Sequence, residues 1–230
     1  MSAMNLRAVA VAAVLTSLIG MSAPASAQTT VDAGINVSVV SDYVFRGFSQ
    51  TNEETALQAG FDMSAGSFYA GVWTSQVDFG DDTDWETDLY MGYRSDVAGF
   101  NVDAGLIGYG YFGAPAGADY DYAEAKLAVS RAVGPASVGV AAYYSPDFFG
   151  VDEEATYYEV NGAVTPFERL SLSGAYGKQQ LDVSDDYSTW NVGLTYTLYE
   201  HAGIDFRYHD TDVDGPLSDE RYVASLKVVY

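Results

Sequence analysis

The chain has no cysteine, only two histidines, and only ten lysine and arginine residues against 32 acids. Without cysteine, a disulfide framework, a thiolate nucleophile and a thiolate metal site are excluded. The acids give a formal net charge of −22 at pH 7, so nucleic acid is not expected as a partner. No linker or low-complexity run divides the chain, which indicates one domain.

The first 27 residues have the features of a removable export signal. Met1–Arg7 is weakly basic, Ala8–Met21 is almost continuously apolar, and small residues at 25–27 form a cleavage site. An apolar run of this length suits a signal peptide better than a membrane anchor. We predict a signal peptide over residues 1–27 and an outer-membrane β-barrel domain over residues 28–230.

From Val31 onward, apolar and polar residues alternate with period two, in segments bounded by Gly, Pro, Asp and Ser. No helical pattern competes with this alternation. The sequence therefore predicts an all-β protein, a transmembrane antiparallel up-and-down β-barrel of about twelve strands, within a range of about 10–14. The strands are expected near residues 37, 58, 72, 90, 105, 126, 140, 160, 172, 193, 206 and 226.

The expected connections alternate between tight turns and long polar loops, as in outer-membrane barrels. Tight turns are expected at residues 65–66, 97–99, 132–135, 165–167 and 200–203. Long loops are expected at residues 46–53, 78–84, 112–120, 146–154, 178–186 and 210–220. An even strand count then lets both termini lie on the periplasmic side.

The two faces of the expected strands differ in polarity. In the strand near residue 90, Trp85, Leu89 and Tyr93 share an apolar face, whereas Glu86 and Asp88 share the opposite face. Because charged side chains must be hydrated or paired, the second face is expected to be wet or internally paired. A soluble sandwich also alternates, but aromatic residues at strand ends, in a chain with 19 tyrosines, favour girdles at two membrane interfaces.

The last strand carries the most specific local pattern. Tyr222, Ala224, Leu226, Val228 and Tyr230 are apolar or aromatic at alternate positions, and the chain ends on an aromatic residue. This pattern resembles the signal by which the bacterial barrel-assembly machinery recognises its substrates. It predicts that machinery as a partner, the Gram-negative outer membrane as the location after export through the periplasm, and lipid and lipopolysaccharide as the surroundings.

Three runs carry a family resemblance: SDYVFRGFSQTNEETALQAGFD at residues 41–62, FYAGVW at 68–73 and ETDLYMGY at 86–93. They resemble the TorF family of porins, a poorly characterised group of Gram-negative outer-membrane proteins. The resemblance extends over the whole mature chain and is most distinctive in its N-terminal third. It implies a barrel with a porin role and supplies no catalytic residues and no substrate.

The polar face would line the lumen of a pore, and it carries nine acids and five bases. This majority favours passive diffusion of small hydrophilic solutes with a preference for cations. In the alternative, charges on neighbouring strands pair and close the interior, leaving a structural or surface-interaction barrel with acidic ligand-binding or ion-binding loops. The expected lining residues are Asp32, Asn36, Asp42, Gln58, Asp62, Glu86, Asp88, Arg94, Asn101, Asp103, Glu124, Lys126, Glu159, Asn161, Asn191, Asp205, Arg207, Arg221 and Lys227.

Arg46 lies at the outer end of the first expected strand. From there its guanidinium can fold inward over Asp42 or Glu86 and line the pore. Two roles remain open for it: selectivity at a constriction, or holding a loop in place.

Acids also gather in the long loops, where they can share divalent cations with lipopolysaccharide phosphates. Asp210, Asp212 and Asp214 have the alternate spacing of calcium ligands, which supply six to eight oxygens. The rest of an EF-hand loop is missing, because Pro216 and Glu220 do not fit its spacing. A solvated acidic loop is the default interpretation, and no resident metal or cofactor is predicted.

An enzyme is not predicted. His201 and His209 are the only histidines that a Ser-His-Asp arrangement could use. His201 falls in a tight turn, and His209 falls on the expected luminal face. No nucleophile-elbow, zinc or phosphate-loop motif is present in the sequence.

Overall fold

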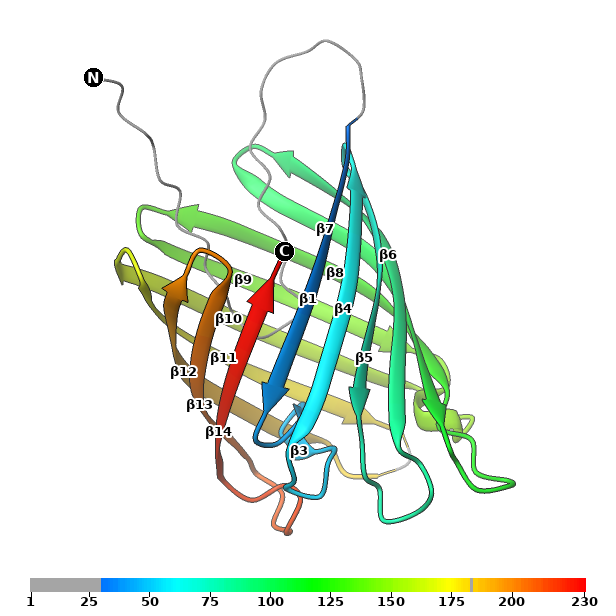
Figure 1. Cartoon of the computed structure of the whole chain (residues 1–230). Coiled ribbons are helices and arrows are strands. Elements are labelled where there is room, and N and C mark those ends of the chain that lie inside the picture. Colours follow the sequence, from blue (N-terminus) through cyan, green and yellow to red (C-terminus); the bar gives the residue numbers. More distant parts are fainter. Residues whose placement is uncertain (1–29, 183) are drawn as a thin grey trace, which may run out of the picture.

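The computed structural model describes residues 30–182 and 184–230. They form a closed, antiparallel, twelve-stranded barrel in which each strand pairs with its neighbours in sequence and β1 pairs with β14 (Figure 1). The predicted signal peptide lies outside the described residues. The barrel strands are β1 (Val31–Val40), β4 (Ala56–Ala65), β5 (Phe68–Gln76), β6 (Trp85–Val97), β7 (Phe100–Phe112), β8 (Tyr122–Val133), β9 (Ala136–Ser145), β10 (Ala155–Phe167), β11 (Leu170–Leu181), β12 (Tyr187–Tyr199), β13 (Ala202–Thr211) and β14 (Arg221–Val229).

The remaining elements lie in the connections of the barrel. β2 (Val44–Phe45) and β3 (Phe48–Ser49) form a two-stranded sheet of their own between β1 and β4. A single turn of 3-10 helix, η1 (Phe148–Gly150), lies between β9 and β10. No helix in the described ranges is long and apolar enough to cross a bilayer.

Short connections gather at one end of the barrel and long ones at the other (Figure 1). β1 begins and β14 ends at the short-turn end, where the Tyr230 amide donates to the Ile35 carbonyl at 2.9 Å. This bond belongs to the seam that closes the barrel. The twelve-strand prediction and the sorting of the loops are confirmed.

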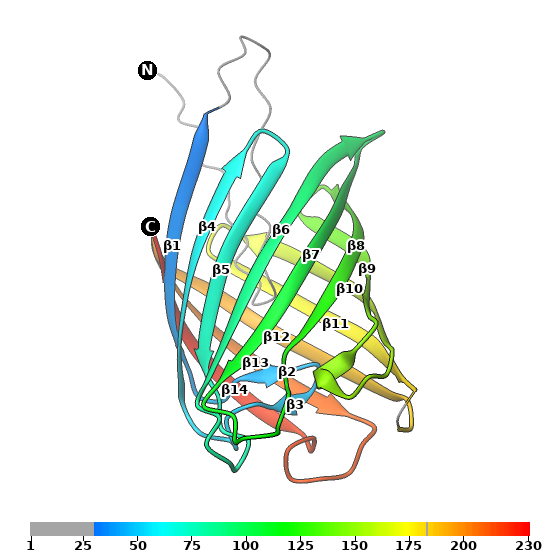
Figure 2. The ribbon, with the colours of Figure 1, turned by 90° about the vertical axis from the view of Figure 1, so that its right-hand side faces the viewer.

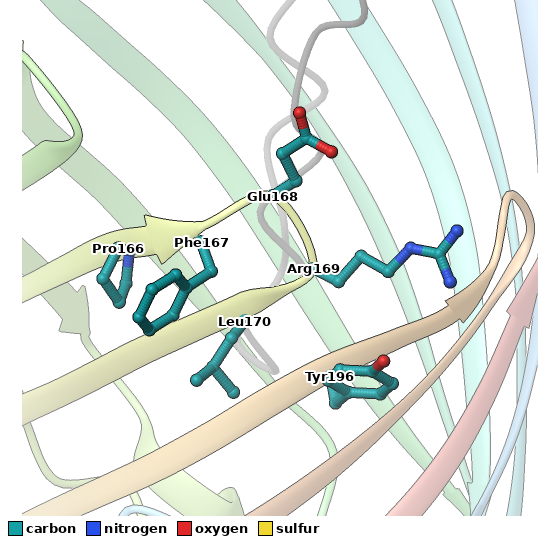
Figure 3. A pocket seen from close by; sticks show the side chains of 6 residues that line it. All are labelled: Pro166, Phe167, Glu168, Arg169, Leu170 and Tyr196. Carbon is teal, nitrogen blue, oxygen red and sulfur yellow. The ribbon is translucent and has the colours of Figure 1, made fainter.

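Two predicted boundaries were wrong around β10 and β11. The turn expected at residues 165–167 lies beyond Phe167, because β10 continues through Pro166 and β11 begins at Leu170 (Figure 3). The register shifts between Val164 and Phe167, and a bulge tolerates a proline because no ladder hydrogen bond is needed there. The loop expected at 178–186 is shorter, since β11 extends to Leu181.

The barrel is apolar outside and charged inside. On β6, Leu89 is 65 % exposed and Met91 is 60 % exposed, whereas Glu86 and Asp88 are 1 % and 4 % exposed. A soluble protein rarely displays such a continuous apolar exterior, and a barrel in lipid requires one. The exterior is therefore suited to a bilayer, and the polar residues line the interior.

Several luminal tyrosines lie flat on neighbouring strands and do not cross the interior. A Cβ added at Gly71 would collide with the ring of Tyr90, and one at Gly177 would collide with the ring of Tyr157. Glycine permits this close approach because it has no side chain. The aromatic rings are thereby kept against the wall of the barrel.

Candidate functional site

The long connection between β1 and β4 folds into the barrel. Figure 2 shows β2 and β3 inside the ring of strands, towards the end with the long loops. The pair Phe45 and Phe48 brackets a two-residue turn in which Arg46 and Gly47 have φ angles of 46° and 91°. Two left-handed residues are typical of tight hairpins, but a left-handed arginine costs about 1–2 kcal/mol. The segment Val44–Ser49 is called the luminal hairpin below.

Asp42 holds the base of the luminal hairpin. One carboxylate oxygen accepts hydrogen bonds from Ser49 Oγ at 2.6 Å and Thr51 Oγ1 at 3.0 Å. The other oxygen pairs with Arg221 Nη1 on β14 at 3.0 Å. Because Ser49 also donates its amide to the Leu217 carbonyl at 2.8 Å, the hairpin is tied to the last strand and its preceding loop.

The tip of the luminal hairpin reaches β12 and β13. A Cβ added at Gly47 would lie 2.7 Å from Thr189 Oγ1 and would also collide with Thr211. The ring of Phe48 packs against Tyr187 at a centroid distance of 5.1 Å. Only glycine therefore fits between the tip and this wall.

The root of the luminal hairpin packs on the other side of the lumen. Tyr43 contacts the ring of Trp73 on β5 at a centroid distance of 5.3 Å and donates its hydroxyl to Glu86 on β6 at 3.3 Å. In either direction around the barrel, at least three strands lie between the pair β5–β6 and the pair β12–β13. The hairpin thus crosses the lumen and narrows it.

Arg46 is the residue that the luminal hairpin places at the far wall. Its Nη2 pairs with Glu124 Oε2 at 2.7 Å, and its Nη1 donates to Gln179 Oε1 at 3.0 Å. Its guanidinium carbon lies 4.4 Å from the ring centroid of Tyr157 and 5.2 Å from that of Tyr143. These contacts combine a charge-assisted hydrogen bond with cation–π attraction.

The sequence predicted that Arg46 folds inward, but the predicted partners were wrong. Asp42 pairs with Arg221, and Glu86 accepts from Tyr43. Arg46 instead reaches Glu124, which is 78 residues away in sequence. That contact depends on the direction of the hairpin and on barrel closure, which no local pattern encodes.

An aromatic cluster beside this site was missed from the sequence. Tyr109 stacks on Tyr122 at 4.2 Å and donates its hydroxyl to Glu124 at 3.0 Å. Phe148 and Phe149 of η1 pack against Tyr122 at 5.0 Å and 4.9 Å. The tyrosines were expected mainly at membrane boundaries. Their alternate positions in β7 and β8, in phase with the charged residues, were the signal that could have placed them inside.

Two further networks run along the wall between neighbouring strands. Asp103 on β7 binds Arg94 on β6 at 3.1 Å and Lys126 on β8 at 2.9 Å. On β13, Asp205 pairs with Arg207 at 3.2 Å. The guanidinium of Arg207 then reaches neighbouring strands, donating to Asn191 Oδ1 on β12 at 2.7 Å and to Ser173 Oγ on β11 at 2.9 Å. These networks cover the wall and do not bridge the lumen.

Four luminal acids have no cationic partner within 4.0 Å among the described residues. Asp62 accepts from Tyr90, and Glu159 accepts from Asn161 at 2.8 Å. Glu86 and Asp88 lie buried beside the luminal hairpin, each with one oxygen that lacks a hydrogen-bond partner. Asp32 is exposed at the short-turn end. The other predicted lining residues follow the inward alternation of their strands: Asn36, Gln58, Asn101, Asn161, Asn191 and Lys227.

The acidic loops are tied internally. Asp81 accepts a hydrogen bond from the Thr83 amide at 2.8 Å, and bonds from Thr83 lower the pKa of Asp81. Asp81 also accepts from the Tyr120 hydroxyl at 2.9 Å, a bond that raises the pKa of Tyr120. Asp210 and Asp212 of the suggested calcium spacing accept separately, from Tyr208 and Ser188. No group of three or more His, Cys, Asp or Glu suited to a metal occurs in the described part of the chain.

Comparison with other proteins gives a family and a fold. The family model "Bacterial protein of unknown function (Gcw_chp)" matches residues 23–228. The "KdgM porin in complex with disordered oligogalacturonate" has a TM-score of 0.61 at 10 % identity, covering 85 % of this chain and 98 % of that chain. A structure of the NanC porin has a TM-score of 0.56 at 9 % identity, covering 86 % and 98 %.

A third structure, "porin refined at 1.8 ångströms resolution", is larger. The match spans 62 % of that chain and 76 % of this one, at 19 % identity and a TM-score of 0.44. No curated protein matches the sequence. At these identities, the likeness to the KdgM and NanC structures shows the barrel fold alone.

Proposed function

Since the chain belongs to Gcw_chp, a family of bacterial proteins of unknown function, we propose its function from its geometry. The protein is a porin-like channel of the Gram-negative outer membrane for passive diffusion of small hydrophilic solutes. The observation that supports this most is the inverted polarity of a closed barrel, with charges inside and apolar side chains outside. We propose no catalytic role.

The outer-membrane location is part of the proposal. It is supported by the apolar exterior and by the predicted export signal. The barrel-assembly machinery is the expected partner of the last strand, whose Tyr222 and Tyr230 side chains are both exposed. Lipopolysaccharide, with divalent cations shared at the acidic loops, is the expected neighbour outside. The more specific assignment to TorF-type porins remains a prediction.

We propose a preference for cations. Five of the six luminal cations lie in ion pairs with carboxylates, leaving only Lys227 without one in the described ranges. Asp62 and Glu159 line the lumen at half-buried positions without an ion pair. Unpaired carboxylates along a narrow passage attract cations and repel anions.

A closed barrel is the second candidate, favoured by the luminal hairpin that crosses the interior. Conductance of the folded, heat-modifiable protein in planar bilayers tests the two. Discrete current steps in the wild-type protein support the channel. Absence of current in the wild type, with current in a variant lacking residues 44–49, would favour the closed barrel. Absence of current in both proteins would contradict any transport function.

A further inference from the structure

Phe45 of the luminal hairpin itself lies next to the Arg46 guanidinium, with its ring centroid 4.7 Å from the guanidinium carbon. The other side chains that contact the guanidinium belong to the barrel wall. Four successive strands each contribute one side chain: Glu124 from β8, Tyr143 from β9, Tyr157 from β10 and Gln179 from β11. These four residues are called the wall cage below. Glu124 is 2 % exposed and Gln179 is 0 % exposed, so the polar members are withdrawn from solvent.

Two members of the wall cage, Glu124 and Tyr157, have supports other than Arg46. Among the described residues, the only side-chain hydrogen bond of Gln179 is the one from Arg46. Glu124 accepts a hydrogen bond from the Tyr109 hydroxyl at 3.0 Å, and Tyr109 is itself stacked on Tyr122 at 4.2 Å. The Tyr157 ring rests on Gly177, where no other residue would leave room for it. Because its charged acceptor and one aromatic face have their own supports, the wall cage is partly preorganised for a ligand.

The occupant, by contrast, is carried by a loop. Arg46 sits at the tip of a hairpin with only two residues in each strand, and so short a hairpin has little stability of its own. Its backbone is in the left-handed region, with φ of 46°, which disfavours the docked conformation. At the wall cage the contacts are made by the side chain of Arg46, and a ligand that makes the same contacts can replace that side chain.

We propose that the wall cage is a binding site for solutes bearing a guanidinium group, and that Arg46 is its built-in occupant. A guanidinium is planar and stacks on aromatic faces, which Tyr143 and Tyr157 supply. It donates several hydrogen bonds in one plane, which Glu124 and Gln179 accept. An ammonium group is a compact point charge without this planar fork, so it fits the cage less well.

Passage of such solutes through the barrel rests on the proposed channel function, whereas binding does not. The two are therefore measured separately. Methylguanidinium is titrated calorimetrically into the folded, detergent-solubilised protein, with methylammonium as the point-charge comparison. Conductance of the same variants is recorded in planar bilayers.

Arg46→Ala empties the cage and is expected to bind methylguanidinium at least tenfold more tightly than the wild type does. Glu124→Gln added to this variant removes the charged acceptor and is expected to abolish the gain. Arg94→Ala is the matched control, because it also removes a luminal arginine but lies outside the cage. The proposal would be overturned if folded Arg46→Ala did not bind methylguanidinium, or if Arg94→Ala bound it equally tightly.

Folding is checked by heat modifiability, and Arg46→Gln replaces Arg46→Ala if the shorter side chain prevents it. Gln keeps most of the length while removing the charge. Binding with no current in any variant would leave the wall cage standing and contradict the channel. Current in all variants, without methylguanidinium binding in either Arg46 variant, would support the channel and contradict the binding site at the wall cage.

Discussion

The ion pair between Arg46 and Glu124 is expected to couple the luminal hairpin energetically to the barrel. Their side chains are 6 % and 1 % exposed, and a charge-assisted hydrogen bond in such surroundings contributes about 1.5–3 kcal/mol. Removing one partner of a buried pair costs about 3–5 kcal/mol when the other charge stays buried. Here Arg46 can leave with the hairpin, so Glu124→Gln should lower the free energy of unfolding by only about 1–3 kcal/mol.

A double-mutant cycle with Arg46→Met and Glu124→Gln measures the coupling, by urea unfolding of the barrel in lipid vesicles. We expect a coupling energy of at least about 1.5 kcal/mol. The exposed pair Lys178–Asp186 is the matched control, since its atoms are 3.5 Å apart and its side chains are 51 % and 37 % exposed. It should give about 0.5 kcal/mol or less. Equal couplings in the two cycles would refute the idea that the hairpin is held by Arg46.

Three further results are expected. Gly47→Ala should push the luminal hairpin off β12 and β13 and raise single-channel conductance. Gly134→Ala is the control, because Gly134 also has a positive φ but has open space around it, and it should leave conductance unchanged. Glu159→Gln should shift the reversal potential in a salt gradient towards zero, and no shift would contradict the role of unpaired acids. Leu89→Lys on the outer face should lower the stability of the barrel in vesicles by about 2–4 kcal/mol, whereas Leu217→Lys in a loop should change it by less than about 0.5 kcal/mol.

Most of the barrel could be predicted from the sequence because lipid outside and polar groups inside impose alternation on every strand. The alternation of Glu86 and Asp88 with Leu89 is visible in the order of the residues alone. The error at residues 165–167 arose because Pro166 was treated as a strand breaker. Proline has no backbone N–H to donate to the ladder, and at a bulge that hydrogen bond is not required.

The candidate site could be predicted only in part. Alternation assigns a side chain to the inside but does not say which strand it faces across the lumen. Arg46 was placed inward, yet its distance to Glu124 is set by the path of the luminal hairpin. Tyr109 and Tyr122 were missed because tyrosine suits both an interface and a packed interior.

The bond between Asp42 and Arg221 has a consequence for assembly. These residues are 179 positions apart, and Arg221 begins the strand that closes the barrel against β1. Asp42 follows β1 directly, so this bond spans the seam at which the two ends of the barrel meet. Joining partners so far apart in sequence has a high cost in loop-closure entropy. The luminal hairpin is therefore fully anchored only in a closed barrel, whichever strand is added last.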